Sequence, residues 1–293
     1  MRSDRQDLSH KRRRRAALAL GAGLVLAMAS PFVSAQEGPA IPQLWESRER
    51  LPRPDISALP RLRFLTTVDF PPFNYLDADG RLVGLHVDLA RAICDVLEAA
   101  ARCEIQALPW EELAPALERG DGEAVIAGLA ATADTRKTLG FSRPYLFFPG
   151  RFVTRTAEPL AEPLPRSLSG QRVGVVAGSA HESFLRDQFS TASAVTFPDQ
   201  AQLLEALKRG EIRAAFGDGL QLAAWLGGPE AGGCCGFAGG PYLAPEYLGT
   251  GLRIAIRKED ETLRQALDHA LHQIGTTNRF TELYLRYFPI SFF

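Results

Sequence analysis

The sequence lacks an excess of charge of either sign. Its 293 residues carry a formal net charge of −1 at pH 7, with 23% charged and 46% hydrophobic residues. Binding along a nucleic-acid backbone requires a surplus of lysine and arginine, so a nucleic acid is not an expected partner. The composition is that of an ordinary soluble protein, and the length suits two domains of roughly 100–150 residues.

Long apolar runs are missing beyond the first 35 residues. No later stretch approaches the roughly 20 apolar residues that a membrane-spanning helix requires. At the start, basic residues at 11–15 precede an apolar run at 16–29 and a small-residue cleavage pattern at 33–35. We therefore expect residues 1–35 to be a cleaved secretory signal peptide. The arginine cluster leaves both the general and the twin-arginine export routes open.

Cysteine and histidine are scarce, with four and five residues. No histidine or second cysteine pair stands at the spacing of a zinc site, so we expect neither a metal nor another cofactor. Cys94 and Cys103 lie nine residues apart, in a predicted helix and at the start of the next strand, which favours a local disulfide. For the adjacent Cys234 and Cys235, a vicinal disulfide, two free thiols and pairing elsewhere all stay open.

Hydrophobic periodicity predicts an open α/β layout with parallel strands after a proline-rich, mobile lead-in at 36–61. The expected strands are 62–68, 103–108, 124–127, 172–176 and 212–216. The expected helices are 85–101, 110–118, 181–189, 200–208, 220–226, 261–274 and 280–288. Residues 69–75 contain two prolines and are expected to form a loop at a strand's carboxyl end, the edge where α/β proteins bind ligands. A hairpin turn is expected at 77–80, and a surface loop at the glycine-rich 227–240.

The stretch at 124–145, AVIAGLAATADTRKTLGFSRPY, contains a candidate ligand loop. A short buried strand is followed by Gly128 and further small residues, which would let a ligand approach free main-chain N–H groups. Arg136, just beyond them, can bind a carboxylate with two parallel hydrogen bonds. The alternative is an ordinary connection in which Arg136 is only solvated.

The order of these segments resembles the family 3 extracellular solute-binding proteins, the periplasmic amino-acid receptors of ABC importers. The matching segments are LRFLTTVDFPPFNYLDADGRLVGLHVDLARAIC, WEELAPALERGDGEAVIAGLAATADTRKTLGFSRPY, GQRVGVVAGSAHESFL, ALKRGEIRAAFGDG and LGTGLRIAIRKEDETLRQALDHAL. The resemblance covers residues 62–288. It implies an α/β, two-lobed periplasmic-binding-protein fold of type II, with a small sheet flanked by helices in each lobe and two hinge strands between them. Lobe 1 would comprise 62–153 plus 253–293, lobe 2 would comprise 164–247, and the hinge would lie near 151–155 and 249–252.

The resemblance also implies the ligand contacts of the first lobe. Arg136 matches the arginine that binds the ligand's α-carboxylate, with backbone groups of Gly128 and Ala130 assisting it. Asp69 and Phe70 occupy the position that shapes the side-chain pocket. Typical receptors carry a hydroxyl residue where this chain has Ala130, and the loop before Arg136 is one residue longer here, so the fold is better defined than the ligand.

In the second lobe, the resemblance implies that Ser179 and Ala180, at a helix N-terminus, donate N–H groups to the same carboxylate. Typical receptors have a threonine in place of Ala180. Asp218 matches the aspartate that binds the α-amino group. Both Asp218 and Ser179 are equally suited to be plain N-caps of the helices that follow them. His181 fits a surface position at a helix start better than a catalytic role.

These features predict a monomeric periplasmic protein that captures an amino acid or a related small carboxylate by hinge closure and delivers it to an ABC permease in the inner membrane. We expect no enzymatic activity. One alternative is a periplasmic protein of the same fold that senses a ligand or binds another partner, such as a redox enzyme. A second is a cyclohexadienyl-type dehydratase, for which His181 and Glu182 are the only acid candidates near the expected site.

Overall fold

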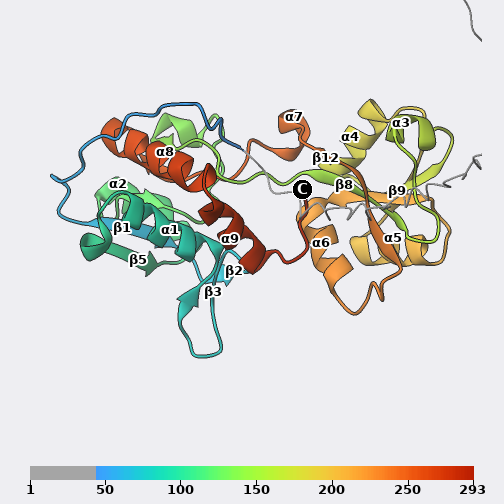
Figure 1. The fold of residues 1–293 in the computed structure, drawn as a ribbon, viewed down its shortest axis with the longest axis horizontal. Coiled ribbons are helices and arrows are strands. Elements are labelled where there is room, and N and C mark those ends of the chain that lie inside the picture. The colour runs from blue at the N-terminus through green and yellow to red at the C-terminus, as the bar shows by residue number, and fades with distance from the viewer. Residues whose placement is uncertain (1–43) are drawn as a thin grey trace, which may run out of the picture. The chain divides into compact units, whose positions relative to one another are not determined.

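The computed structural model describes residues 44–293, so the expected signal peptide at 1–35 and the first part of the lead-in lie outside the described residues. Residues 44–293 form two five-stranded sheets and a small three-stranded sheet, with helices packed on the larger two (Figure 1). Within this range, no helix combines the length and the apolar character that crossing a bilayer requires.

The first sheet has the strand order β5-β1-β6-β13-β7. Its strands are β1 (Leu62–Thr66), β5 (Cys103–Ala107), β6 (Ala124–Val125), β7 (Leu139–Phe141) and β13 (Ala255–Arg257). Its helices are α1 (Leu85–Val96), α2 (Trp110–Arg119), α8 (Glu261–Gly275) and α9 (Asn278–Tyr287), with the short 3₁₀ helices η1 (Ala100–Arg102) and η2 (Thr135–Lys137). Strand β1 runs parallel to β5 and β6 and is buried along almost its whole length, which explains its nearly continuous apolar sequence.

The second sheet has the order β10-β9-β11-β8-β12. Its strands are β8 (Gly150–Arg155), β9 (Arg172–Val176), β10 (Ser193–Phe197), β11 (Ala214–Asp218) and β12 (Cys235–Tyr242). Its helices are α3 (Leu164–Ser167), α4 (Ala180–Gln188), α5 (Gln200–Lys208), α6 (Gly219–Gly227) and α7 (Pro245–Leu248). Strand β8 places residues 150–153 in this sheet, whereas the sequence assigned them to the first lobe.

Strand β12 corrects the loop expected at 227–240. From Cys235 onward the chain pairs antiparallel with β8, with Phe237 opposite Val153. Its glycines suggested a loop, but an edge strand tolerates glycine, and the pairing becomes irregular only between Ala238 and Tyr242. The expected loop therefore ends where this strand begins.

The cysteines form two disulfides, one between Cys94 and Cys103 and one between Cys234 and Cys235. The first joins α1 to β5. Helix α1 ends at Val96, five residues earlier than expected, because the chain turns back at Glu98, which has a φ of 53°. That turn brings the next strand alongside the end of the helix.

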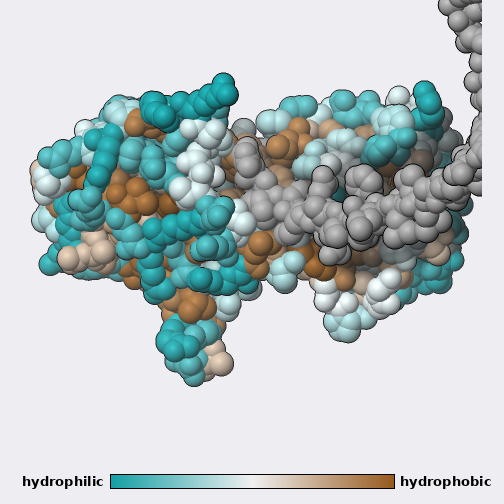
Figure 2. Space-filling view, viewed as in Figure 1, coloured by the Kyte–Doolittle hydropathy of each residue, from teal (hydrophilic) through white to brown (hydrophobic). Residues whose placement is uncertain are grey.

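Residues 69–83 form a small antiparallel sheet of β2 (Asp69–Phe70), β3 (Asn74–Leu76) and β4 (Leu82–Val83), so the loop expected at 69–75 is partly extended. The turn between β3 and β4 is the hairpin expected from its sequence. In Figure 2 the tip of this hairpin is hydrophilic and its base is hydrophobic. Gly84 follows with a φ of 130°, and a Cβ there would lie 2.2 Å from the carbonyl oxygen of Phe73, so only glycine fits.

Two chain segments connect the large sheets. Residues 142–149 lead from β7 to β8, and residues 243–254 lead from β12 to β13. We call them the crossing segments. They pair with each other, since the N–H of Leu252 donates to the carbonyl of Leu146 at 2.7 Å and the N–H of Tyr145 donates to the carbonyl of Leu252 at 2.9 Å.

The lead-in makes contacts from residue 44 onward that its composition did not predict. The Trp45 ring meets the His272 ring of α8 edge-on at 5.9 Å, and His269 of the same helix lies 3.2 Å from the carbonyl oxygen of Leu51. Ile56 is buried in the core of the first sheet. Residues 45–56 therefore lie against the first sheet's helices.

A chain of buried polar side chains joins the first sheet, α1 and a crossing segment. The Asn74 amide nitrogen donates to the hydroxyl of Thr67 at 2.8 Å, and its oxygen lies 2.7 Å from Nδ1 of His86. Nε2 of His86 lies 2.7 Å from the hydroxyl of Tyr145. The Asn74 oxygen can only accept, so Nδ1 carries a proton, and in the neutral imidazole Nε2 accepts from the hydroxyl of Tyr145. Burial agrees, because it lowers the pKa of His86 to about 3.

The buried His86 predicts a loss of stability in mild acid. Its pKa is about 3 in the folded state against an ordinary value of 6.5, so the unfolded chain binds the proton more readily. The free energy of unfolding should therefore fall as the pH drops from 6.5 toward 3, by up to about 1.4 kcal/mol per pH unit. Urea denaturation at pH 7, 6 and 5 measures the slope, and His86→Gln is the control that should lose it. Equal slopes in both proteins would contradict this account.

Candidate functional site

Two adjoining cavities open at the carboxyl ends of β1 and β6. A cavity of about 280 Å³ is lined by Thr67, Asp69, Phe70, Trp110, Ala127 and Gly128. A second cavity of about 350 Å³ is lined by Gly128, Leu129, Ala130, Ala131, Thr132, Phe148, Leu248, Gly249, Thr250, Gly251 and Leu252. Gly128 belongs to both, and we call the two together the Gly128 cleft. Of the predicted site residues, it contains Asp69, Phe70, Gly128 and Ala130.

The walls of the smaller cavity are aromatic. The Phe70 ring stacks on Phe73 at 4.7 Å, which fixes its orientation. A Cβ on Gly128 would lie 3.4 Å from the Phe70 ring, so a larger residue would narrow the cavity. Trp110 is 50% exposed although it is the largest hydrophobic side chain here. An exposed indole beside an apolar ring and the carboxylate of Asp69 suits a flat or cationic group.

Trp110 was missed by the sequence analysis. It stands at the first position of α2, immediately after the chain leaves β5. Strands β5, β1 and β6 are parallel neighbours, so their carboxyl ends lie at one edge of the sheet. An aromatic residue directly after such a strand was the signal that could have identified it.

Arg136 lies on η2, next to the larger cavity. Its Nε donates to the carbonyl of Ala131, a cavity residue, at 3.3 Å, and its guanidinium carbon lies 5.4 Å from the centre of the Phe141 ring. Within residues 44–293, its two terminal nitrogens have no hydrogen-bond or ion-pair partner. The side chain is exposed and lines neither cavity. Its terminal donors are thus available to an anion.

The loop before Arg136 is held by its own hydroxyls. The Thr135 hydroxyl donates to the carbonyl of Ala130 at 2.7 Å, and the N–H of Thr135 donates to the hydroxyl of Thr132 at 3.1 Å. These bonds hold residues 130–135 in a compact turn. They thereby order the backbone that lines the larger cavity.

Arg253 is a second cation near Arg136. Its Nη1 donates to the carbonyl of Ser142 at 2.9 Å, and its Nε is buried with no hydrogen-bond partner among the described residues. Burial, and then the charge of Arg136, lowers the pKa of Arg253. The region around the larger cavity thus has a local excess of positive charge.

The second-sheet candidates act as helix caps. The Ser179 hydroxyl accepts from the N–H of Glu182 at 3.1 Å and caps α4. The Glu182 carboxylate accepts from the N–H of Gly178, one residue before the cap, at 2.8 Å. The Asp218 carboxylate accepts from the N–H of Gln221 at 3.0 Å and caps α6. Ser179, Ala180 and Asp218 line neither cavity of the Gly128 cleft.

Asp218 is nevertheless not an ordinary surface cap. It is half-buried, and desolvation raises the pKa of its carboxyl group. His181 is half-buried, with its ring edge-on to Phe216 at 5.8 Å, so it is not the surface residue that the sequence suggested. Burial lowers the pKa of His181, and the charge of Asp218 acts in the opposite direction.

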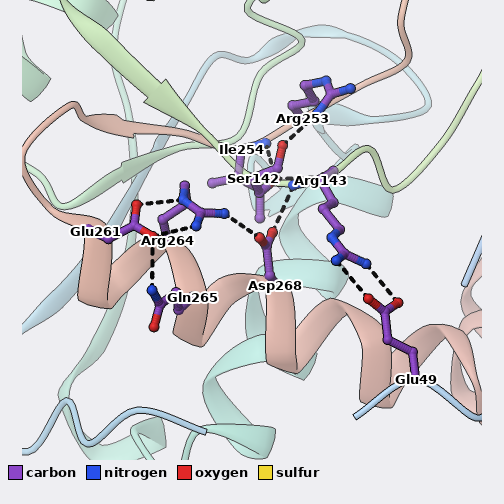
Figure 3. Close-up of polar contacts among 9 residues, drawn as sticks. All are labelled: Glu49, Ser142, Arg143, Arg253, Ile254, Glu261, Arg264, Gln265 and Asp268. Atoms are coloured by element: carbon purple, nitrogen blue, oxygen red, sulfur yellow. Dashed lines mark hydrogen bonds and ion pairs between the residues drawn. The ribbon is translucent and has the colours of Figure 1, made fainter. Parts of the chain in front are cut away.

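A polar network supports the crossing segments where they leave the first sheet (Figure 3). The Arg143 guanidinium binds both oxygens of Glu49 at 2.7 Å, which ties the lead-in to the first crossing segment. The N–H of Arg143 donates to Asp268 of α8 at 2.7 Å. Arg253 of the second crossing segment donates to the carbonyl of Ser142. The crossing segments are therefore anchored at the first-sheet end.

Comparisons with known proteins identify the family and the fold. The sequence model of the bacterial extracellular solute-binding proteins, family 3, matches residues 62–290. The ABC transporter arginine-binding protein 1 of Escherichia coli K12 is 28% identical over 235 residues, which are 80% of this chain and 93% of that protein.

Two solved structures show the same fold. The L-cystine solute receptor of Neisseria gonorrhoeae, in an unliganded open conformation, has a TM-score of 0.64 at 18% identity and covers 78% of this chain and 92% of its own. An ancestral cyclohexadienyl dehydratase has a TM-score of 0.66 at 20% identity and covers 78% of this chain and 93% of its own. The two-lobed α/β fold expected from the sequence is thereby confirmed.

The Ser179 cap predicts that its removal lowers the stability of the protein whether or not a ligand is bound. Ser179→Ala removes the acceptor for the N–H of Glu182 and should cost about 1 kcal/mol of unfolding free energy, as N-cap replacements usually do. Asp199→Ala is the matched control, because Asp199 caps α5 through the N–H of Gln202 at 2.8 Å. Urea denaturation should show similar losses for both variants, and an unchanged midpoint for Ser179→Ala would contradict the capping role.

Proposed function

Because the chain belongs to family 3 of the bacterial extracellular solute-binding proteins, matched over residues 62–290, we propose that it is a periplasmic amino-acid receptor of an ABC importer. The observation that carries this proposal is the Gly128 cleft. Its ordered backbone and two aromatic side chains adjoin the guanidinium of Arg136, whose terminal nitrogens are unpaired among the described residues. In this proposal, residues 1–35 are the export signal, the protein works as a monomer, and it performs no chemistry on its ligand.

The carboxylate end of the ligand lies at Arg136. A bidentate pair between a guanidinium and a carboxylate is among the strongest polar contacts available at a protein surface. The N–H groups of Gly128 and Ala130 add donors from the loop. The nearby charge of Arg253 strengthens the local positive potential, which favours an anionic group at this end of the cleft.

The side-chain end lies between Phe70 and Trp110, with Asp69 beside them. Aromatic faces attract a cation, and a carboxylate next to them increases that preference. The E. coli relative is named for binding arginine. We therefore propose a cationic or flat amino-acid side chain as the preferred occupant of the smaller cavity.

The second sheet completes the site by moving toward the first. Ser179, Ala180 and Asp218 lie outside the Gly128 cleft, so they reach a bound ligand only if the crossing segments bend. The N–H of Gly178 is occupied by Glu182, which leaves the N–H of Ala180, at the first position of α4, for the carboxylate. The carboxylate of Asp218 then meets the ligand's α-amino group. This closed form is the state that a permease recognises.

A dehydratase function that uses Glu182 as its general acid is disfavoured by the contacts of this residue. The Glu182 carboxylate is engaged by the N–H of Gly178 and by Arg186, and these contacts lower its pKa. A general acid requires a raised pKa and a free path to the ligand. Glu182 has neither.

Ligand binding through Arg136 is tested by thermal shift. With L-arginine, L-histidine, L-glutamine and succinate as probes, at least one amino acid should raise the melting temperature, because a ligand at 100 times its Kd stabilises the folded state by about 2.7 kcal/mol. Arg136→Ala should weaken binding by about tenfold or more, since it removes charged hydrogen bonds. Lys137→Ala, in the same exposed turn, is the control. Equal binding by the two variants would contradict the role of Arg136.

A second variant tests the side-chain cavity. Trp110→Ala should weaken binding of the responding amino acid by roughly fivefold or more, through loss of the aromatic face. Leu76→Ala is the matched control, because Leu76 is also 50% exposed but lines neither cavity of the Gly128 cleft. Calorimetric titration of the two variants compares them directly. An unchanged Kd in Trp110→Ala would place the ligand's side chain elsewhere.

A further inference from the structure

Arg151 is a buried cation that has no acidic partner in the part of the chain that the structure describes. It stands on β8 of the second sheet and is only 7% exposed. Its Nη1 donates to the carbonyl of Phe292 at 3.2 Å, and its guanidinium carbon lies 4.2 Å from the centre of the Phe237 ring. Its Nε has no hydrogen-bond partner within residues 44–293. A guanidinium removed from water usually requires a carboxylate, so the contacts it does make call for an explanation.

The carbonyl that Arg151 binds belongs to the segment that follows α9. Residues 288–293, which we call the 288–293 arm, follow α9, a helix that packs on α1 and α8 of the first sheet. In Figure 1 the red chain leaves α9 and ends beside β8 and α6. The arm thus connects the two sheets in addition to the two crossing segments.

The arm is held firmly on its first-sheet side. The rings of Phe288 and Phe292 are buried in a hydrophobic cluster formed mainly by first-sheet residues, and they meet each other at 5.1 Å. The Phe292 ring also lies 5.2 Å from Tyr284 of α9, whose hydroxyl accepts from the N–H of Phe292 at 3.1 Å. Burial of two aromatic rings and a backbone hydrogen bond anchor the arm to α9.

Its contacts with the second-sheet part of the chain involve smaller groups. Ala223 of α6 is buried in the same hydrophobic cluster as the rings of the arm, and Leu220 of α6 and Phe237 of β12 pack against that cluster. The aromatic ring pairs of the arm, by contrast, join it to Phe73 and Tyr284 of the first-sheet part.

Besides Arg151, the arm approaches α6 at both of its ends. A Cβ on Gly219 would lie 3.2 Å from the carbonyl oxygen of Phe292, and a Cβ on Gly227 would lie 3.3 Å from the side chain of Ile290. Glycine at these two positions lets the arm lie close against α6.

From this asymmetry we propose that the 288–293 arm is a releasable latch between the two sheets, fastened to the second sheet by the contact of Arg151 with the carbonyl of Phe292. If the sheets move apart, this contact breaks before those that hold the arm to α9. The cost of breaking this contact is partly offset, because water can then solvate the guanidinium. Its Nε has no hydrogen-bond partner among the described residues while the latch is closed. The burial that lowers the pKa of Arg151 is relieved by the same movement.

The latch is tested in the ligand-free protein, so its failure and a failure of the proposed ligand site are distinguishable. Spin labels at Glu118→Cys on α2 and Ala201→Cys on α5, both exposed, report the separation of the two sheets by pulsed electron resonance. Arg151→Met removes the charge and the donors but keeps a long apolar side chain. It should broaden the distance distribution and shift the population ratio about tenfold, the size expected for the loss of one hydrogen bond from a charged group.

The control is Arg155→Gln on the same strand. The Arg155 guanidinium donates to the carbonyls of Leu207 and Ile212, within the second-sheet part of the chain, so this variant should leave the distribution unchanged. Ile290→Ala should shift the distribution in the same direction as Arg151→Met, and by less. If Arg151→Met fails to fold, Ile290→Ala decides the question. The proposal would be overturned if Arg151→Met and Ile290→Ala gave the wild-type distance distribution. An equal shift in Arg155→Gln would also overturn it.

Discussion

The buried chain of Thr67, Asn74, His86 and Tyr145 is the constraint on which the site depends. Each member comes from a different part of the first-sheet unit, and each hydrogen bond is made away from water, where an unpaired group would be costly. Thr67 lines the smaller cavity, whereas Tyr145 belongs to the first crossing segment. The neutral His86 between them therefore couples the wall of the cleft to the connection between the sheets.

The residues that the two sheets contribute to the proposed site are held in place by different contacts. On the first sheet, the loop at 128–136 is closed by the hydroxyls of Thr132 and Thr135, and the Phe70 ring is fixed by Phe73, so contacts within the protein shape the cleft. On the second sheet, Ser179 and Asp218 already serve as caps. A side chain that caps a helix is held in place at little cost, and it can still accept a further hydrogen bond from a ligand. The structural and the ligand-binding interpretations of these residues are therefore compatible.

Much of the architecture could be predicted from the sequence, because parallel buried strands such as β1 and amphipathic helices such as α8 leave strong periodic signals. Within the candidate site, the sequence indicated residues that affect the course of the backbone, such as Gly128 directly after a strand. The sequence did not reveal Trp110 as a cavity residue, since an aromatic at a helix start is commonly packing. It also missed β12 and the contacts of Trp45 and Arg151, which depend on partners more than 80 residues away. The hydrophobic pattern of a short segment does not show which distant residue the segment will contact.

The central claim is that the carboxylate of an amino acid binds at the guanidinium of Arg136 with its side chain in the Gly128 cleft. A crystal structure of the protein with the most stabilising amino acid tests it most directly. The account predicts a carboxylate within hydrogen-bond distance of the terminal nitrogens of Arg136 and a side chain between Phe70 and Trp110. A ligand bound outside the cleft, or one whose carboxylate is held by other residues, would contradict it.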